Sequence, residues 1–144
     1  MSWVAGVAAV GAGVIGGVFF AFSVSIMPAF ARLAPTHGTA VMQAINITIV
    51  RAPFLIVFIG TVLACVAQVI VEPTDLLGWL GAALYVLGGF GLTMVANVPM
   101  NNRLMTVDPE APDDYWQTYA SRWTMWNHVR TVACIGAAAA MTFS

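Results

Sequence analysis

Two arginines stand among hydrophobic residues and are the first candidates for chemistry. Arg51 and Arg130 border or lie within long apolar runs, and neither run contains an Asp or a Glu. A guanidinium in such surroundings carries a high desolvation cost unless polar groups, water or an anion compensate it. Two interpretations follow: the side chain reaches out to lipid headgroups, or it binds polar groups or an anion inside the protein.

A second group of reactive side chains precedes Arg130 in the sequence. His128 can change its charge near neutral pH, which suits acid–base chemistry, although a neutral histidine bonded to Ser or Asn is the structural alternative. At helical periodicity Trp123, Asn127 and Arg130 project to one side of the same helix. An aromatic stripe usually packs against neighbouring helices. This stripe leads into polar residues, which favours a ligand pocket.

No metal site or cofactor is expected. Cys65 and Cys134 lie in apolar runs and are interpreted as small apolar residues. His37 lies in a loop far from His128, so these two histidines cannot jointly ligate a haem iron. The sequence places no cysteine or carboxylate cluster near them, which disfavours any metal bound by protein ligands.

The composition is that of an integral membrane protein. The 144 residues are 60% hydrophobic and only 8% charged, with a mean hydropathy of +0.89. Soluble domains usually carry about 25% charged residues, so lipid must cover much of this surface. The net charge of −1 and the absence of Lys argue against nucleic acid as a partner. One domain, residues 1–144, is expected.

Polar turns at 34–38, 72–75 and 106–114 separate four mainly apolar segments. They predict an all-α membrane four-helix bundle with antiparallel neighbours. Only the second half of the last segment is apolar, so its polar half must be sheltered by protein. The expected spans are 3–32, 39–71, 76–105 and 115–143.

The polar residues of the four spans fall at one depth. Counting about 1.5 Å per residue from the end that holds both termini places Arg51, Asn97 and Trp123 about 32 Å deep. Pro28, Pro53 and Pro99 lie at or just beyond the same level, and proline can bend membrane helices and splay a bundle open. We therefore expect a shared cavity that is lined by Ser23, Asn46, Arg51, Asn97, Asn127, His128 and Arg130.

Small residues and arginines give two further expectations. Gly13-x-x-x-Gly17 is a spacing that lets membrane helices approach closely, either inside this bundle or in a homo-oligomer. Arg32, Arg103 and Arg122 all lie at the end of the first and third turns. Because positive charge stays cytoplasmic, both termini are expected outside.

Four segments resemble motifs of the anthrone oxygenase family. They are Phe19–Pro28, Met42–Asn46, Asn97–Asn102 and Trp123–Thr131. The resemblance extends over nearly the whole chain and implies the same four-helix membrane fold, with the bacterial inner membrane as the expected location. It also implies the oxidation of anthrones to anthraquinones by dioxygen, without a cofactor.

The implied reaction assigns roles to the residues. An anthrone loses a methylene proton to give an electron-rich enolate that can reduce dioxygen. The expected catalytic residues are His128 as the base, with Arg130 and Asn127 stabilising the oxyanion. The expected substrate-binding residues are Ser23, Asn46, Arg51, Asn97, Asn101, Trp123 and Trp126.

Two other classes of function stay open. The first is a non-catalytic protein that binds a lipid or a quinone, for instance as an accessory subunit. The second is a transporter, which the absence of a clear internal repeat disfavours. Turnover with dioxygen alone would distinguish an enzyme from a binding protein.

Overall fold

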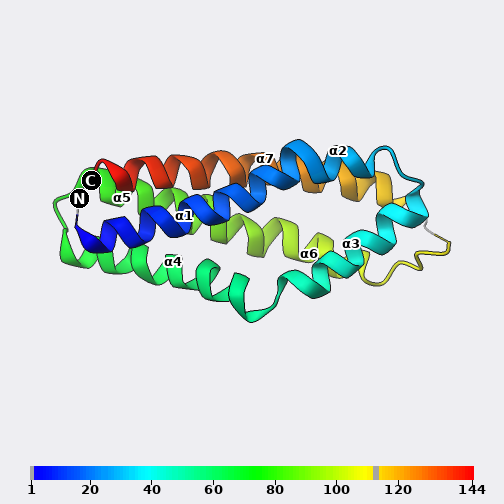
Figure 1. Cartoon of the computed structure of the whole chain (residues 1–144), viewed down its shortest axis with the longest axis horizontal. Helices are drawn as coiled ribbons and strands as arrows, with labels where there is room; N and C mark the ends of the chain where they lie inside the picture. Colours follow the sequence, from blue (N-terminus) through cyan, green and yellow to red (C-terminus); the bar gives the residue numbers. More distant parts are fainter. Residues whose placement is uncertain (1, 112–113) are drawn as a thin grey trace.

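The computed structural model describes residues 2–111 and 114–144, and every regular element in these ranges is helical. The helices lie side by side in an elongated assembly, with both termini at one end (Figure 1). The elements are α1 (Trp3–Ala21), η1 (Phe22–Ile26), α2 (Met27–Phe30), α3 (Pro35–Ile49), α4 (Ala52–Val71), α5 (Leu76–Ala83), η2 (Leu84–Gly91), η3 (Thr93–Asn97), α6 (Val98–Leu104) and α7 (Tyr115–Thr142), where η denotes a π-helical segment.

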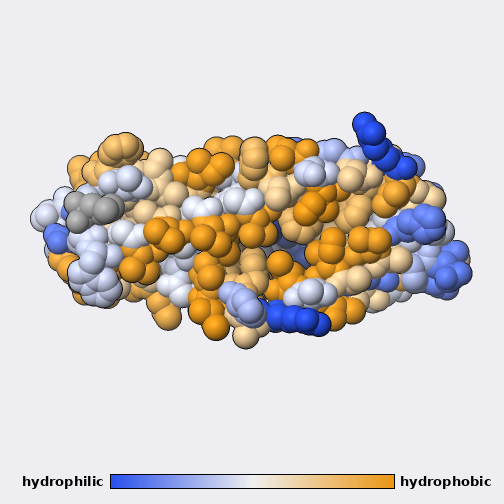
Figure 2. Space-filling model, viewed as in Figure 1, coloured by the Kyte–Doolittle hydropathy of each residue, from blue (hydrophilic) through white to orange (hydrophobic). Residues whose placement is uncertain are grey.

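Three helical stretches of the described chain are long and apolar enough to cross a membrane, Trp3–Phe30, Ala52–Val71 and Leu76–Leu104. Hydrophobic residues cover most of the face seen in Figure 2, and hydrophilic residues gather toward the end opposite the termini. These features indicate a membrane protein. Helix α7 is 28 residues long but does not belong to this apolar group.

Hydrogen bonds join the N-terminal end of α1 to the turn between α4 and α5. Ser2 Oγ accepts a hydrogen bond from Ala5 N at 3.1 Å and donates one to Gln68 Oε1 at 2.7 Å. Gln68 Nε2 donates to Asp75 Oδ2 at 3.0 Å, and Asp75 Oδ1 accepts from Leu77 N at 3.1 Å. Ser2 and Asp75 are the N-cap residues of α1 and α5, and each accepts a hydrogen bond from a free backbone N–H of its helix. Gln68 links the two caps because it contacts both side chains.

The tightest glycine contacts within α1 differ from the Gly13-x-x-x-Gly17 expectation. A methyl group at Gly11 would overlap Thr61 of α4, and one at Gly16 would lie 3.2 Å from Cβ of Cys134 on α7. At Gly17 the same methyl group would meet nothing within 4 Å. Close packing of α1 therefore depends on Gly11 and Gly16, which let neighbouring helices approach.

Each proline in the polar layer follows an irregular segment. Pro28 comes after η1 and Pro99 after η3, while Pro53 follows a break at Val50 and Arg51. Proline has no N–H and its ring displaces the carbonyl four residues earlier, so the regular helical pattern cannot continue through it. The single helix predicted over 39–71 is consequently divided into α3, which begins earlier at residue 35, and α4.

Candidate functional site

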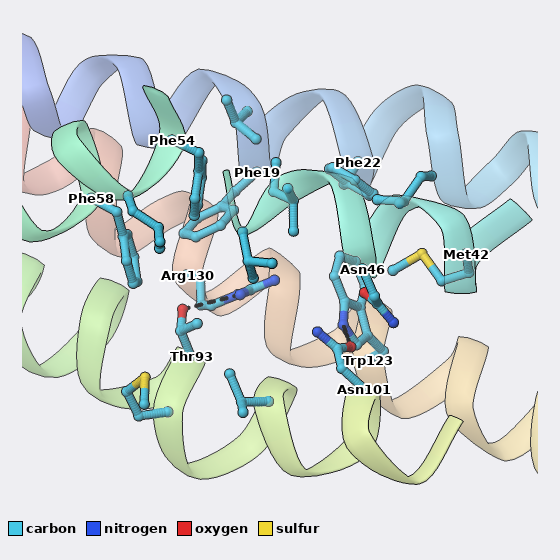
Figure 3. A pocket seen from close by; sticks show the side chains of 17 residues that line it. Phe19, Phe22, Met42, Asn46, Phe54, Phe58, Thr93, Asn101, Trp123 and Arg130 are labelled. Atoms are coloured by element: carbon cyan, nitrogen blue, oxygen red, sulfur yellow. Dashed lines mark hydrogen bonds between the residues drawn. The ribbon is translucent and has the colours of Figure 1, made fainter. Parts of the chain in front are cut away.

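A cavity of about 290 Å³ lies between α1 and η1, the α3–α4 break, η3 and α6, and α7. Figure 3 shows it from close by. Its volume is at the lower end of small-molecule sites, which span about 300–1,000 Å³, so it suits one compact ligand. Most of its wall is apolar, and its aromatic residues are Phe19, Phe22, Phe54, Phe58 and Trp123.

Arg130 is the cation of this cavity and is only 3% exposed. Its Nη1 donates to Thr93 Oγ1 at 3.0 Å, and its Nη2 donates to Asn127 Oδ1 at 2.7 Å. The guanidinium carbon lies 4.0 Å from the centre of the Phe19 ring and 5.1 Å from that of Trp123. All of these partners are neutral, and Nε has no hydrogen-bond partner among the described residues. The charge therefore has donors left for an anionic ligand.

Asn127 holds Arg130 in place from behind the cavity wall. Its Nδ2 donates to the backbone oxygen of Phe19 and to Ser23 Oγ, both at 2.7 Å. These two bonds leave Oδ1 to accept from the guanidinium. Ser23 belongs to η1, and π-helical turns of this kind are frequent at functional sites. The local irregularity of the first span thus supports the position of Arg130.

A second polar group of the cavity is the Asn101 amide. Its Oδ1 accepts hydrogen bonds from Tyr119 Oη at 2.8 Å and from Trp123 Nε1 at 2.9 Å. Asn97 is fully buried one turn away and donates to the backbone oxygen of Trp123 at 3.4 Å. Asn46 lines the cavity from α3, and its buried Nδ2 makes no hydrogen bond of standard geometry to the residues that the structure describes.

Several predicted site residues meet at this cavity, and others lie behind its wall. The residues that line it are Asn46, Asn101, Trp123 and Arg130. The buried residues that support the wall without lining it are Ser23, Asn97 and Asn127. The polar residues of the expected layer thus come from η1, α3, η3, α6 and α7.

The seven residues expected to line one shared cavity do not all do so: Asn46 and Arg130 line it, whereas Ser23, Asn97 and Asn127 lie behind its wall. His128 and Arg51 lie away from it, and so does Trp126 of the expected binding residues. His128 is exposed in a separate groove of about 550 Å³, where its Nδ1 lies 2.9 Å from Ser23 Oγ. It projects about 100° around the α7 axis from Asn127, because successive residues of an α-helix are separated by that angle. Arg51 is exposed at the break between α3 and α4, beside Pro53, and Trp126 is half-buried.

Sequence reasoning missed Phe19 and Thr93 as functional residues. Phe19 belongs to the motif-like segment Phe19–Pro28, but nothing in the sequence indicated that its ring would lie against the Arg130 guanidinium. Thr93 precedes Asn97 by one helical turn, and this spacing could have placed both on the buried face. In residues 2–111 and 114–144 no group of three His, Cys, Asp or Glu side chains could hold a metal ion.

Apolar helices long enough to span a bilayer indicate a helical membrane protein, and the described part of the chain encloses an aromatic cavity with Arg130 in its wall. The anthrone oxygenase family profile matches residues 41–140, and the chain belongs to this family. The matched region contains Asn101 and Arg130 but begins after Phe19. Comparison with curated proteins and with solved structures gave no match. Family membership indicates an oxygenase-like function.

Proposed function

We propose that the protein is a cofactor-independent membrane oxygenase. Its substrate would be a compact aromatic compound of the anthrone, phenol or quinol type, and its oxidant dioxygen. The observation that carries this proposal is the buried Arg130, whose described partners are neutral and which faces an aromatic cavity. A fixed cation shielded from bulk water stabilises an anion far better than a water-exposed charge does.

The cavity residues suit a flat, ionisable ring. Phe19 and Trp123 lie on the guanidinium of Arg130, and Phe54 stacks on Phe58 with ring centres 5.3 Å apart. Aromatic rings bind other rings through dispersion and through edge-to-face or offset contacts. A ligand oxygen at Arg130 would place the attached ring among these side chains.

The proposed reaction balances without a cofactor. Loss of one proton from the substrate gives an enolate, whose oxygen pairs with Arg130. The enolate transfers one electron to dioxygen, and the resulting superoxide and carbon radical combine to a peroxide. Protonation of the peroxide, loss of the remaining proton on carbon and cleavage of the O–O bond give a ketone and water. One anthrone and one dioxygen thus yield one anthraquinone and one water.

Arg130 would promote ionisation by stabilising the enolate. None of the described residues that line the cavity carries an imidazole or a carboxylate, so the proton would pass to water. His128 contacts Ser23, which in turn contacts Asn127. The Asn127 amide does not readily relay protons between Ser23 and Arg130. We therefore assign His128 the role of positioning Ser23 and Asn127, and not that of a base.

We also propose that α7 crosses the membrane and completes a four-helix bundle. At about 1.5 Å per residue its length is about 42 Å, enough to span a bilayer. Its polar residues Asn127, Arg130 and Thr131 are buried, so they would not face lipid. The positions of Arg32, Arg103 and Arg122 favour external termini in a bacterial inner membrane.

Oxygen uptake by the pure protein tests the proposal. The protein in detergent or nanodiscs would be mixed with anthrone, and dioxygen consumption and anthraquinone formation would be followed together. We expect equal amounts of both, well above the rate without protein, and an uptake that Arg130→Met abolishes. Tight binding without uptake would favour the alternative of a lipid- or quinone-binding protein. Equal rates with and without protein would overturn the oxygenase.

A further inference from the structure

The orientation of the Asn101 amide can be assigned from its partners. Trp123 Nε1 can only donate a hydrogen bond, so the amide atom 2.9 Å from it must be the oxygen. The same oxygen accepts from Tyr119 Oη at 2.8 Å. Two donors therefore occupy Oδ1 and hold the amide in one orientation, with Nδ2 on its other side.

The amide nitrogen of Asn101 is directed toward the interior of the cavity. Figure 3 shows it on the side that faces Arg130, away from the bond to Trp123. Asn101 lines the cavity, and most of the cavity wall is apolar, including Val98, Met94 and Phe22. The N–H groups of Asn101 are thus placed to donate to a ligand.

We infer that Asn101 is a specificity-determining residue that binds a second acceptor oxygen of the ligand, in addition to the oxygen paired with Arg130. This inference rests on the proposed function, which places the ligand's anionic oxygen at Arg130. The two donors lie around one side chain: Arg130 is 5.1 Å from the centre of the Trp123 ring, and Asn101 is bonded to its Nε1. A compact ring with two oxygens can reach both.

The physical reason for selectivity is the cost of an unpaired buried donor. A ligand that presents only carbon to Asn101 removes water from its N–H groups without replacing the hydrogen bond. A ligand with an acceptor oxygen there restores that bond. Sites that hydrogen-bond a ligand group discriminate strongly against analogues that lack it.

Asn101→Asp separates this role from a structural one. The Asp side chain retains an oxygen for Tyr119 and Trp123 but replaces the donating NH₂ with an acceptor. Asn102→Asp, at the adjacent exposed position, is the matched control for the added charge. Both variants would be checked for an unchanged melting temperature before ligands are compared.

The probes would be 2-naphthols that carry either a methoxy group or an ethyl group of the same size, at each ring position in turn. Quenching of tryptophan fluorescence would give each Kd. At one ring position or more, we expect the wild type and Asn102→Asp to bind the methoxy compound at least about fivefold more tightly than its ethyl partner. Asn101→Asp should remove or reverse this preference.

Two results would contradict the inference in different ways. If the methoxy preference is absent from the wild type at all positions, or survives in Asn101→Asp, Asn101 does not bind a ligand oxygen. That outcome leaves the proposed function standing, provided that all the naphthols bind to the wild type and that Arg130→Met weakens their binding. If the wild type binds none of them, the proposed function fails and this inference fails with it.

Discussion

Asn127 Oδ1 accepts a hydrogen bond from Arg130 Nη2 at 2.7 Å, one helical turn along the same helix. The Asn127 amide is fully buried, and its nitrogen is held by the Phe19 carbonyl and by Ser23. The guanidinium is therefore attached to the scaffold on one side and faces the cavity on the other. Such preorganisation lets a charge stabilise a developing anion without a cost of reorientation at that moment.

The first prediction concerns the shape of this cation. Arg130→Lys should lower kcat/KM for anthrone oxidation about 100-fold, in the range found when an oxyanion donor is removed. The planar guanidinium can donate hydrogen bonds to Thr93, Asn127 and the ligand at the same time, whereas a compact ammonium cannot. Oxygen uptake at several anthrone concentrations would measure the effect.

Arg122→Lys, at an exposed position on the same helix, is the matched control and should retain full activity. The melting temperature of both variants would show whether they fold. An Arg130→Lys protein that folds and turns over at the wild-type rate would remove the guanidinium from the mechanism.

The layer of polar residues was predictable because helical rise converts sequence position into depth. The common depth of Asn97 and Trp123 followed from that count and from the four apolar segments. Depth does not give the direction around each helix axis, however. His128 and Asn127 have almost the same depth, yet one lines an outer groove and the other is buried.

The irregular helices could not be predicted in detail. Proline at 28, 53 and 99 indicated a disturbance, but the sequence did not distinguish π-helical segments at η1 and η3 from the break before α4. The same proline chemistry allows each outcome, and packing against neighbouring helices decides between them. Because the break before α4 was not predicted, Arg51 was expected to line the cavity, whereas its side chain is exposed at that break.

The second prediction separates positioning by His128 from its earlier assignment as the base. Since His128 contacts Ser23 rather than the cavity, His128→Gln should keep oxygen uptake within about threefold of the wild type, a loss of under 1 kcal/mol. His128→Ala should lower it further, because Ser23 then loses a hydrogen-bond partner. Measured KM should change little in either variant. A well-folded His128→Gln protein without activity would restore His128 as the base.

The third prediction concerns packing of α1. Gly11→Ala should lower the melting temperature in detergent, because its methyl group overlaps Thr61 and must push α1 away from α4. The cost of such overpacking is typically about 1–3 kcal/mol. Gly17→Ala, which meets nothing within 4 Å, is the control and should leave the melting temperature unchanged. Equal melting temperatures for the two variants would refute this account of the α1–α4 contact.

The last prediction concerns acid sensitivity at the end that holds both termini. The hydrogen bond from the backbone N–H of Gly78, followed by those from Gln68 and Leu77, lowers the pKa of Asp75 below the ordinary value of an aspartate. A carboxylate with a lowered pKa in the folded state stabilises the fold above its unfolded pKa, and this contribution is lost as pH falls through the folded pKa. Thermal stability of the wild type should therefore decline with acidification below about pH 4 more steeply than that of Asp75→Asn, which keeps an acceptor for α5 but cannot titrate. Melting temperatures between pH 7 and the acid limit of the detergent would measure both slopes. Identical slopes would mean that Asp75 does not couple protonation to folding, and that the bonds to Gln68 and the α5 cap persist when the carboxyl is neutral.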